Sequence, residues 1–134
     1  MAIYGGTIMD SRSLMIGDWV LIEDTLRRVA QLTKHQVVGY HLAEGECVMH
    51  YARLCETEPI PLTPEILEKN GWKEAQFWHE YQDGKNTIQS CLPEMRGIIN
   101  GVEIQHFKCE YVHQYQHLLR LCGLEELADE FEID

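Results

Sequence analysis

The sequence lacks the residue spacings that several common chemistries need. No two of its five cysteines lie at the Cys-x-x-Cys spacing of a zinc knuckle or a redox motif. It contains no glycine pattern of a phosphate-binding or dinucleotide-binding loop, and no Gly-x-Ser-x-Gly nucleophile elbow. We therefore expect a protein that is not an enzyme and that needs no cofactor.

Long apolar runs are absent too. No run approaches the ~18 residues of a membrane span, and the first residues do not form a basic region followed by an apolar core, as a signal peptide would. The odd, scattered cysteines fit reduced thiols. These features predict a cytoplasmic protein that does not bind membranes.

Basic residues are scarce and unevenly placed. The chain has 134 residues with 11 Lys and Arg against 22 Asp and Glu, a formal net charge of −11. Residues 1–64 carry a net charge of −3 and residues 65–134 a net charge of −8, and residues 125–134 hold six acids and no base. Because such a chain is repelled by phosphate backbones, we expect no direct binding to nucleic acid. The charge would suit a protein partner with a basic surface, which is the partner we expect; taken alone, however, the charge is explained first by its effect on solubility.

The stretch from Glu110 to Cys122 is the strongest local signal. Its apolar residues recur at helical spacing, which predicts an amphipathic helix that ends at Gly123. The other face should meet water or a partner, and with Trp78 it forms our predicted partner-binding set: His113, Gln114, Gln116, His117, Arg120 and Trp78. The apolar stripe could also face a twin subunit, which leaves a homodimer open.

The first half of the chain is typical of a small β structure. Apolar or β-branched runs at residues 17–22, 26–32, 36–41 and 47–51 are separated by short turns, and residues 2–8 could add an earlier strand. Strands of this length with short loops predict a small SH3-like β-barrel.

The second half mixes helix and strand. Thr63 and Pro64 predict the start of a short helix that stops at Gly71. Asp83-Gly84 and Asn100-Gly101 predict two antiparallel hairpins, with strands at 75–82, 86–92, 97–99 and 102–107. The predicted fold is therefore α+β: an SH3-like barrel, a helix, two hairpins and a C-terminal amphipathic helix. We expect residues 1–134 to form one compact domain, with a β-rich part at 1–58 and an α+β part at 59–134.

Three phrases carry a family likeness: Ile16–Val20, then Glu58–Thr63 with Leu67 and Gly71-Trp72, and then Glu110–Gln116. They resemble RIGNWV, PIPLT followed by Leu and Gly-Phe, and YVHQLQNL, which are motifs of a family of small uncharacterised proteins. Members of that family occur in Bacteroides-type bacteria, their phages and their mobile elements. Here Tyr115 stands for a leucine and His117 for an asparagine. The resemblance implies a phage or mobile-element origin in a bacterial host, where an acidic inhibitor of a host defence protein is a concrete hypothesis.

Two chemical alternatives stay open beside that hypothesis. His113 and His117 lie four residues apart, a spacing that can grip one metal ion, with His79, His106 or Cys109 as a third ligand. The thiols of Cys91 and Cys109 could pair with a histidine for nucleophilic catalysis. A third alternative, from another class, is a protein that sequesters a small molecule or nucleotide.

Overall fold

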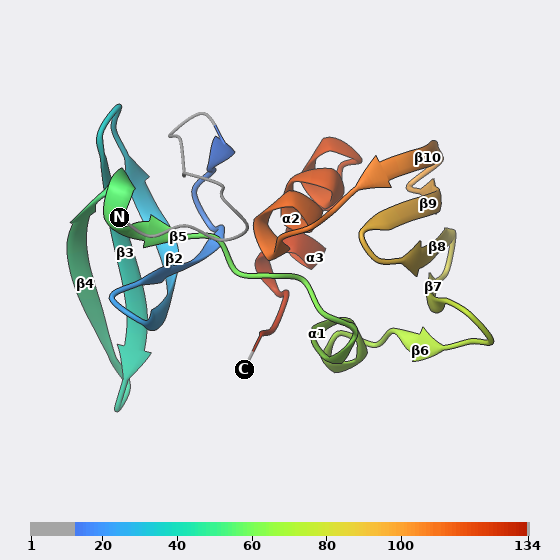
Figure 1. Cartoon of the computed structure of the whole chain (residues 1–134), viewed down its shortest axis with the longest axis horizontal. Helices are drawn as coiled ribbons and strands as arrows, with labels where there is room; N and C mark the ends of the chain where they lie inside the picture. The colour runs from blue at the N-terminus through green and yellow to red at the C-terminus, as the bar shows by residue number, and fades with distance from the viewer. Residues whose placement is uncertain (1–12, 134) are drawn as a thin grey trace. The chain divides into compact units, whose positions relative to one another are not determined.

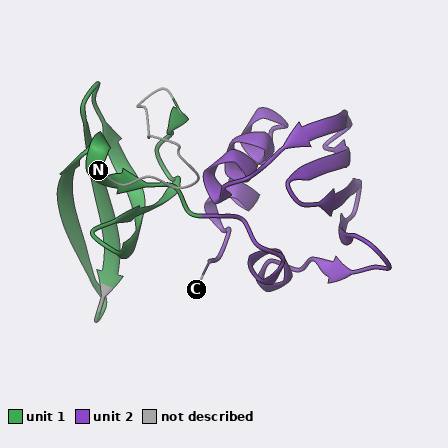
Figure 2. Ribbon diagram, in the orientation of Figure 1, with its two compact units in different colours: residues 1–60 green, residues 61–134 purple. Residues whose placement is uncertain are grey.

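The computed structural model describes residues 13–133 and divides the chain into two compact units, Met1–Ile60 and Pro61–Asp134 (Figure 2). We call them unit 1 and unit 2. The predicted strand at residues 2–8 lies outside the described residues. The expectation that both units form one domain stays a prediction.

The described part of unit 1 forms one antiparallel sheet in the order β4-β3-β2-β1-β5, of which Figure 1 labels β2, β3, β4 and β5. Its strands are β1 (Trp19–Ile22), β2 (Thr25–Leu32), β3 (Gln36–Ala43), β4 (Glu46–Arg53) and β5 (Thr57–Glu58), and a 3₁₀ turn, η2 (Leu54–Glu56), precedes β5. The four strands predicted for this half of the chain are confirmed.

The predicted SH3-like barrel is wrong. Strand order places β4 at one edge of the sheet and β5 at the other, and among the described residues no pairing joins these two edges. β5 has only two residues and pairs with β1 alone, so it cannot close a barrel against a β4 of eight residues. The α+β class is also wrong, because the described residues are mostly β, with 48% strand and 21% helix.

The two faces of the unit 1 sheet differ in burial. One face carries a cluster of buried apolar residues: Leu14, Val20, Ile22, Val29, Val37 and Leu54. On the other face the pairing of β3 with β4 brings Leu42, Met49 and Tyr51 together, and all three are exposed. Unit 1 therefore buries one side of its sheet and leaves apolar side chains on the other.

Unit 2 contains a second antiparallel sheet, a meander in the order β10-β9-β8-β7-β6. Its strands are β6 (Lys73–Glu74), β7 (His79–Asp83), β8 (Asn86–Cys91), β9 (Glu94–Ile99) and β10 (Val102–Lys108). The Asp83↔Asn86 and Ile99↔Val102 pairs confirm both predicted hairpins. The hairpins are joined through β8 and β9, and residues 75–78, predicted as strand, form a loop between β6 and β7.

Three helices complete unit 2: α1 (Pro64–Lys69), α2 (Val112–Leu121) and α3 (Glu125–Asp129). The Thr63 hydroxyl accepts a hydrogen bond from the Ile66 amide at 3.3 Å, which caps α1 as predicted. Gly123 has φ 83° and ends α2. Of the helices in the described residues, none is long and apolar enough to cross a membrane.

Candidate functional site

The polar side chains of α2 do not form the solvent-facing surface that the sequence predicted. His113 is 4% exposed and Gln116 is fully buried, while Arg120 has a side chain only 10% exposed. The Gln116 amide donates to the Ala128 carbonyl of α3 at 3.1 Å, so this residue ties two helices together. The prediction that this face meets water is wrong for His113 and Gln116, because α2 is covered on both its apolar and much of its polar side.

The other members of the predicted set have partial structural roles. The Gln114 side chain accepts hydrogen bonds from the backbone amides of Glu110 and Tyr111 at 2.7 and 3.1 Å, and these bonds cap the N-terminus of α2. The Arg120 guanidinium lies 3.5 Å from the Asp129 carboxylate. Whether these side chains also bind a partner stays a prediction.

The histidine pair of α2 gains no third ligand among residues 13–133. The His113 and His117 rings have centroids 5.5 Å apart and meet edge to face, and His113 stacks on the Tyr111 ring at 5.9 Å. None of the residues expected to complete this site joins it within the described chain. The described residues do bring three metal-ligating atoms together at another place, around His79 of β7.

The two candidate nucleophiles lie in opposite environments. Cys109 is buried, and burial raises the pKa of its thiol to about 12. At neutral pH it is therefore a protonated thiol, which is a poor nucleophile. Cys91 is exposed at the end of β8.

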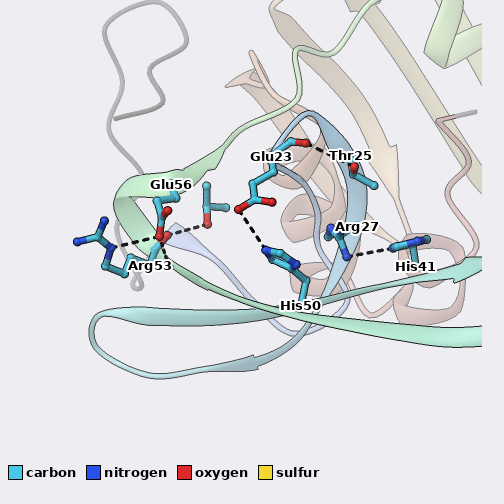
Figure 3. A network of polar contacts seen from close by, with 8 residues as sticks. Glu23, Thr25, Arg27, His41, His50, Arg53 and Glu56 are labelled. Atoms are coloured by element: carbon cyan, nitrogen blue, oxygen red, sulfur yellow. Dashed lines mark hydrogen bonds and ion pairs between the residues drawn. The ribbon is translucent and has the colours of Figure 1, made fainter.

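The polar contacts of unit 1 in Figure 3 join a strand to a turn or to another strand. His50 of β4 lies 3.5 Å from the Glu23 carboxylate in the β1–β2 turn, and Arg27 Nη1 lies 3.0 Å from Nδ1 of His41. Glu56 accepts hydrogen bonds from the Arg53 amide and guanidinium, and these two bonds lower the pKa of Glu56. Each contact ties neighbouring chain segments of the sheet, so we interpret this network as structural.

Trp78 lies beside an apolar pocket on the unit 2 sheet. The pocket has a volume of about 300 Å³ and is bordered by the β6–β7 loop and by β8, β9 and β10. Trp78 is half-buried, and its indole Nε1 is buried with no hydrogen-bond partner among the described residues. Its neighbour Phe77 is 85% exposed at the rim. This volume is near the lower limit for pockets that hold small molecules.

A second hollow in unit 2 is acidic. It has a volume of about 440 Å³ and lies between the β7–β8 turn and α3. Four carboxylates line it and no basic residue does: Asp83, Glu125, Glu126 and Glu130. Gly123, Leu124 and Leu127 form much of the remaining lining. We call this hollow the acidic groove.

Hydrogen bonds between turns hold the acidic groove in shape. The Asn86 side chain accepts from the Asn100 amide at 2.7 Å, and the Asn100 side chain donates to the Cys122 carbonyl at 2.8 Å. The two hairpin turns are thereby fixed to the end of α2, where Gly123 turns the chain into α3. The Tyr81 hydroxyl donates to Asp83 at 3.3 Å. These hydrogen bonds fix the backbone segments that carry the lining residues of the acidic groove.

Sequence reasoning identified the acidity of residues 125–134 but not the groove. Asp83 was recognised only as a hairpin-turn residue and Asn86 only as the first residue of a predicted strand, and both lie more than thirty positions from the acidic segment. No pattern in the sequence predicts that the β7–β8 turn and α3 line one hollow. Their placement depends on a third segment, since Asn100 bonds both to Asn86 beside the turn and to Cys122 at the end of α2.

Comparison with protein-family models, with curated proteins and with solved structures gave no match. The interpretation of the site therefore rests on its geometry and its chemistry.

Proposed function

We propose that the protein is a non-enzymatic binding protein and that its acidic groove receives a basic segment of a partner protein. The observation that carries the proposal is the lining: four carboxylates and no basic side chain around one hollow. A lysine or arginine side chain would enter it with its charge matched and its methylenes against Leu124 and Leu127.

The charge distribution supports the same surface. Unit 2 holds fourteen of the 22 acids, so the field of the whole molecule would steer a basic partner toward it. The resemblance stated above adds a biological setting, in the cytoplasm of a bacterial host. An inhibitor that covers the basic surface of a host defence protein is the concrete candidate within that setting.

The test compares two variants of equal charge. In the first, Glu125→Gln, Glu126→Gln and Glu130→Gln neutralise the groove. In the matched control, Glu44→Gln, Glu46→Gln and Glu103→Gln neutralise three exposed acids that do not line the groove. Both variants have a net charge of −8, so a difference between them reports on position and not on overall charge.

Binding of a hexa-arginine peptide is measured by calorimetry at low and at high salt. We expect the groove variant to bind about tenfold more weakly than the control, since three exposed ion pairs together contribute on the order of 1–2 kcal/mol. The affinity should fall as salt rises. If both variants bind hexa-arginine equally weakly, the affinity depends on the net charge of the protein and not on the groove, and the proposal is overturned.

The apolar pocket beside Trp78 supports a second candidate, sequestration of a small molecule. Its volume and its apolar border are the specific observations in favour. Thermal shifts across a panel of nucleotides and aromatic metabolites, with Trp78→Ala for comparison, separate this candidate from peptide binding. A ligand that stabilises the parent but not the variant would favour it.

A further inference from the structure

The atoms gathered around His79 form a second feature of unit 2, separate from the acidic groove. An imidazole nitrogen of His79 and carboxylate oxygens of Glu68 and Glu74 all lie within 4.8 Å of one another. His79 Nε2 is 4.0 Å from an oxygen of Glu68. The three residues come from three elements: Glu68 from α1, Glu74 from β6 and His79 from β7.

Strand register places two of these ligands side by side. Glu74 and His79 are direct partners in the β6–β7 pair, so their side chains leave the same face of the ribbon. The next pair, Lys73 and Glu80, leaves the opposite face because side chains alternate along a strand. Lys73 therefore lies on the face of the β6–β7 pair opposite to Glu74 and His79, and its charge does not neutralise the carboxylate of Glu74 on that face.

The third ligand is held by the packing of α1. Leu67, its neighbour in the helix, is fully buried, and Trp72, beyond the helix end, is also buried. The Trp72 amide donates to the Leu67 carbonyl at 3.2 Å, and Gly71 takes φ 89° to make this close return possible. The Asn70 side chain holds the end of α1 to Glu132 through bonds of 2.6 and 2.7 Å. Glu68 is thus carried on a fixed backbone beside the ribbon.

We propose that Glu68, Glu74 and His79 bind one divalent transition-metal ion, for which Zn²⁺ is the probe. An ion central to three atoms no more than 4.8 Å apart lies within about 2.8 Å of each, against ~2.0–2.2 Å for bonds of zinc to nitrogen and oxygen. Side-chain movements of less than about 1 Å close that gap, and both glutamates are exposed enough to make them. One imidazole with two carboxylates favours zinc or manganese over Ca²⁺, which takes six to eight oxygen ligands.

The bound ion would stabilise β6, the short edge strand of the second sheet. β6 has two residues, and it lies at the edge of the sheet with β7 as its partner. An ion shared by α1, β6 and β7 links this edge to the helix. Binding should therefore raise the melting temperature, because the ion binds the folded chain in preference to the unfolded chain.

Calorimetric titration with Zn²⁺ tests the site in protein purified without a histidine tag. The parent carries Cys47→Ala and Cys91→Ala, so that the two exposed thiols do not bind the metal. We expect one equivalent to bind and the melting temperature to rise. His79→Gln and Glu74→Gln should each weaken binding by tenfold or more.

A matched control comes from the same sheet. Glu94 and His106 form an exposed carboxylate–imidazole pair at 3.5 Å that has no third ligand among the described residues. The double variant Glu94→Gln/His106→Gln should bind Zn²⁺ as the parent does. The proposal is overturned if the parent binds no zinc at 100 µM, if the control loses binding as His79→Gln does, or if His117→Gln abolishes binding while His79→Gln retains it.

Discussion

Units 1 and 2 each contain a five-stranded antiparallel sheet, yet they use it differently. Unit 1 has no α-helix in its described part, and β3 and β4 leave Leu42, Met49 and Tyr51 exposed on one face. In its described part, unit 2 adds three helices, whereas buried polar residues occur in both units. Of these helices, α3 carries Glu125 and Glu126, two of the four acids that line the groove.

The two units also differ in how their acidic residues are placed. Unit 1 has a net charge of −3 spread over turns and strands, whereas unit 2 has −8 and concentrates four acids around one hollow. Charge alone acts mainly on solubility. The proposed function requires in addition that charge be held around a hollow, and the hydrogen bonds Asn86–Asn100 and Asn100–Cys122 hold the segments beside it.

The largest expected effect compares one glycine from each sheet. Gly97 of β9 has φ 142°, and a Cβ there would collide with the Thr87 carbonyl oxygen. Gly97→Ala should lower the free energy of unfolding by about 3–5 kcal/mol. Gly39 of β3 has no such backbone conflict, and its added Cβ would meet only side-chain atoms, among them Cδ1 of Ile22 at 2.7 Å and Cβ of Arg27 at 3.1 Å. Gly39→Ala should cost about 1–2 kcal/mol.

Urea unfolding of both variants measures these costs, and amide hydrogen exchange assigns each loss to a unit. Protection lost in unit 2 alone for Gly97→Ala, and in unit 1 alone for Gly39→Ala, would indicate two independently unfolding units. Equal loss across both would support one cooperative domain. A cost for Gly97→Ala below that for Gly39→Ala would contradict the backbone argument.

A buried polar residue of α2 gives the next effect. Gln116→Ala removes the hydrogen bond to the Ala128 carbonyl and should cost about 2 kcal/mol. Since this bond ties α3 to α2, the variant should also weaken hexa-arginine binding, whereas an exposed residue of the same helix should not. Leu121→Ala, whose side chain is exposed, is the control. Stability and binding both unchanged in Gln116→Ala would contradict the buried position.

The buried thiol of Cys109 predicts a loss of stability at alkaline pH. The unfolded thiol loses its proton near pH 9, while burial holds the pKa of the folded thiol at about 12. Between these values the unfolded state binds fewer protons, so the free energy of unfolding falls as pH rises, by at most about 1.4 kcal/mol per pH unit from this group. Below pH 9 the contribution is constant.

Urea unfolding at a series of pH values measures this slope. Cys109→Ala should make it shallower, while Cys91→Ala, at an exposed position, should leave it unchanged. The remaining slope includes Tyr115, whose pKa burial also raises. An identical slope in Cys109→Ala and the parent would contradict the assignment.

The smallest effect belongs to the uncovered face of unit 1. Tyr51 is 75% exposed, so Tyr51→Thr should change the free energy of unfolding by less than about 0.5 kcal/mol. Val37→Thr, at a fully buried position on β3, should cost several times more. Comparable costs in urea unfolding would mean that the Tyr51 face is covered in solution, for example by a second copy of the chain.

The sequence predicted local structure better than it predicted assembly. Helix ends and turns were predicted correctly, because these signals depend on the local backbone conformation and not on distant contacts. The signals were Thr63-Pro64, Asp83-Gly84, Asn100-Gly101 and Gly123. The prediction of a barrel was wrong because closure requires β5 to be long enough to pair with β4. β5 has only two residues, and so short a strand shows no alternation of apolar and polar residues from which its length could be predicted. His113 and Gln116 were wrongly placed in water because a helical pattern identifies the apolar face, but not what covers the polar one.

The measurement that tests the acidic groove most directly is a residue-level map of peptide binding. Amide chemical shifts of the full chain are followed by NMR as hexa-arginine is added at moderate salt. Binding in the groove predicts saturable shifts concentrated at residues 83–86 and 123–130, with unit 1 little changed. Shifts spread over the exposed acids of both units, or concentrated in unit 1, would contradict it.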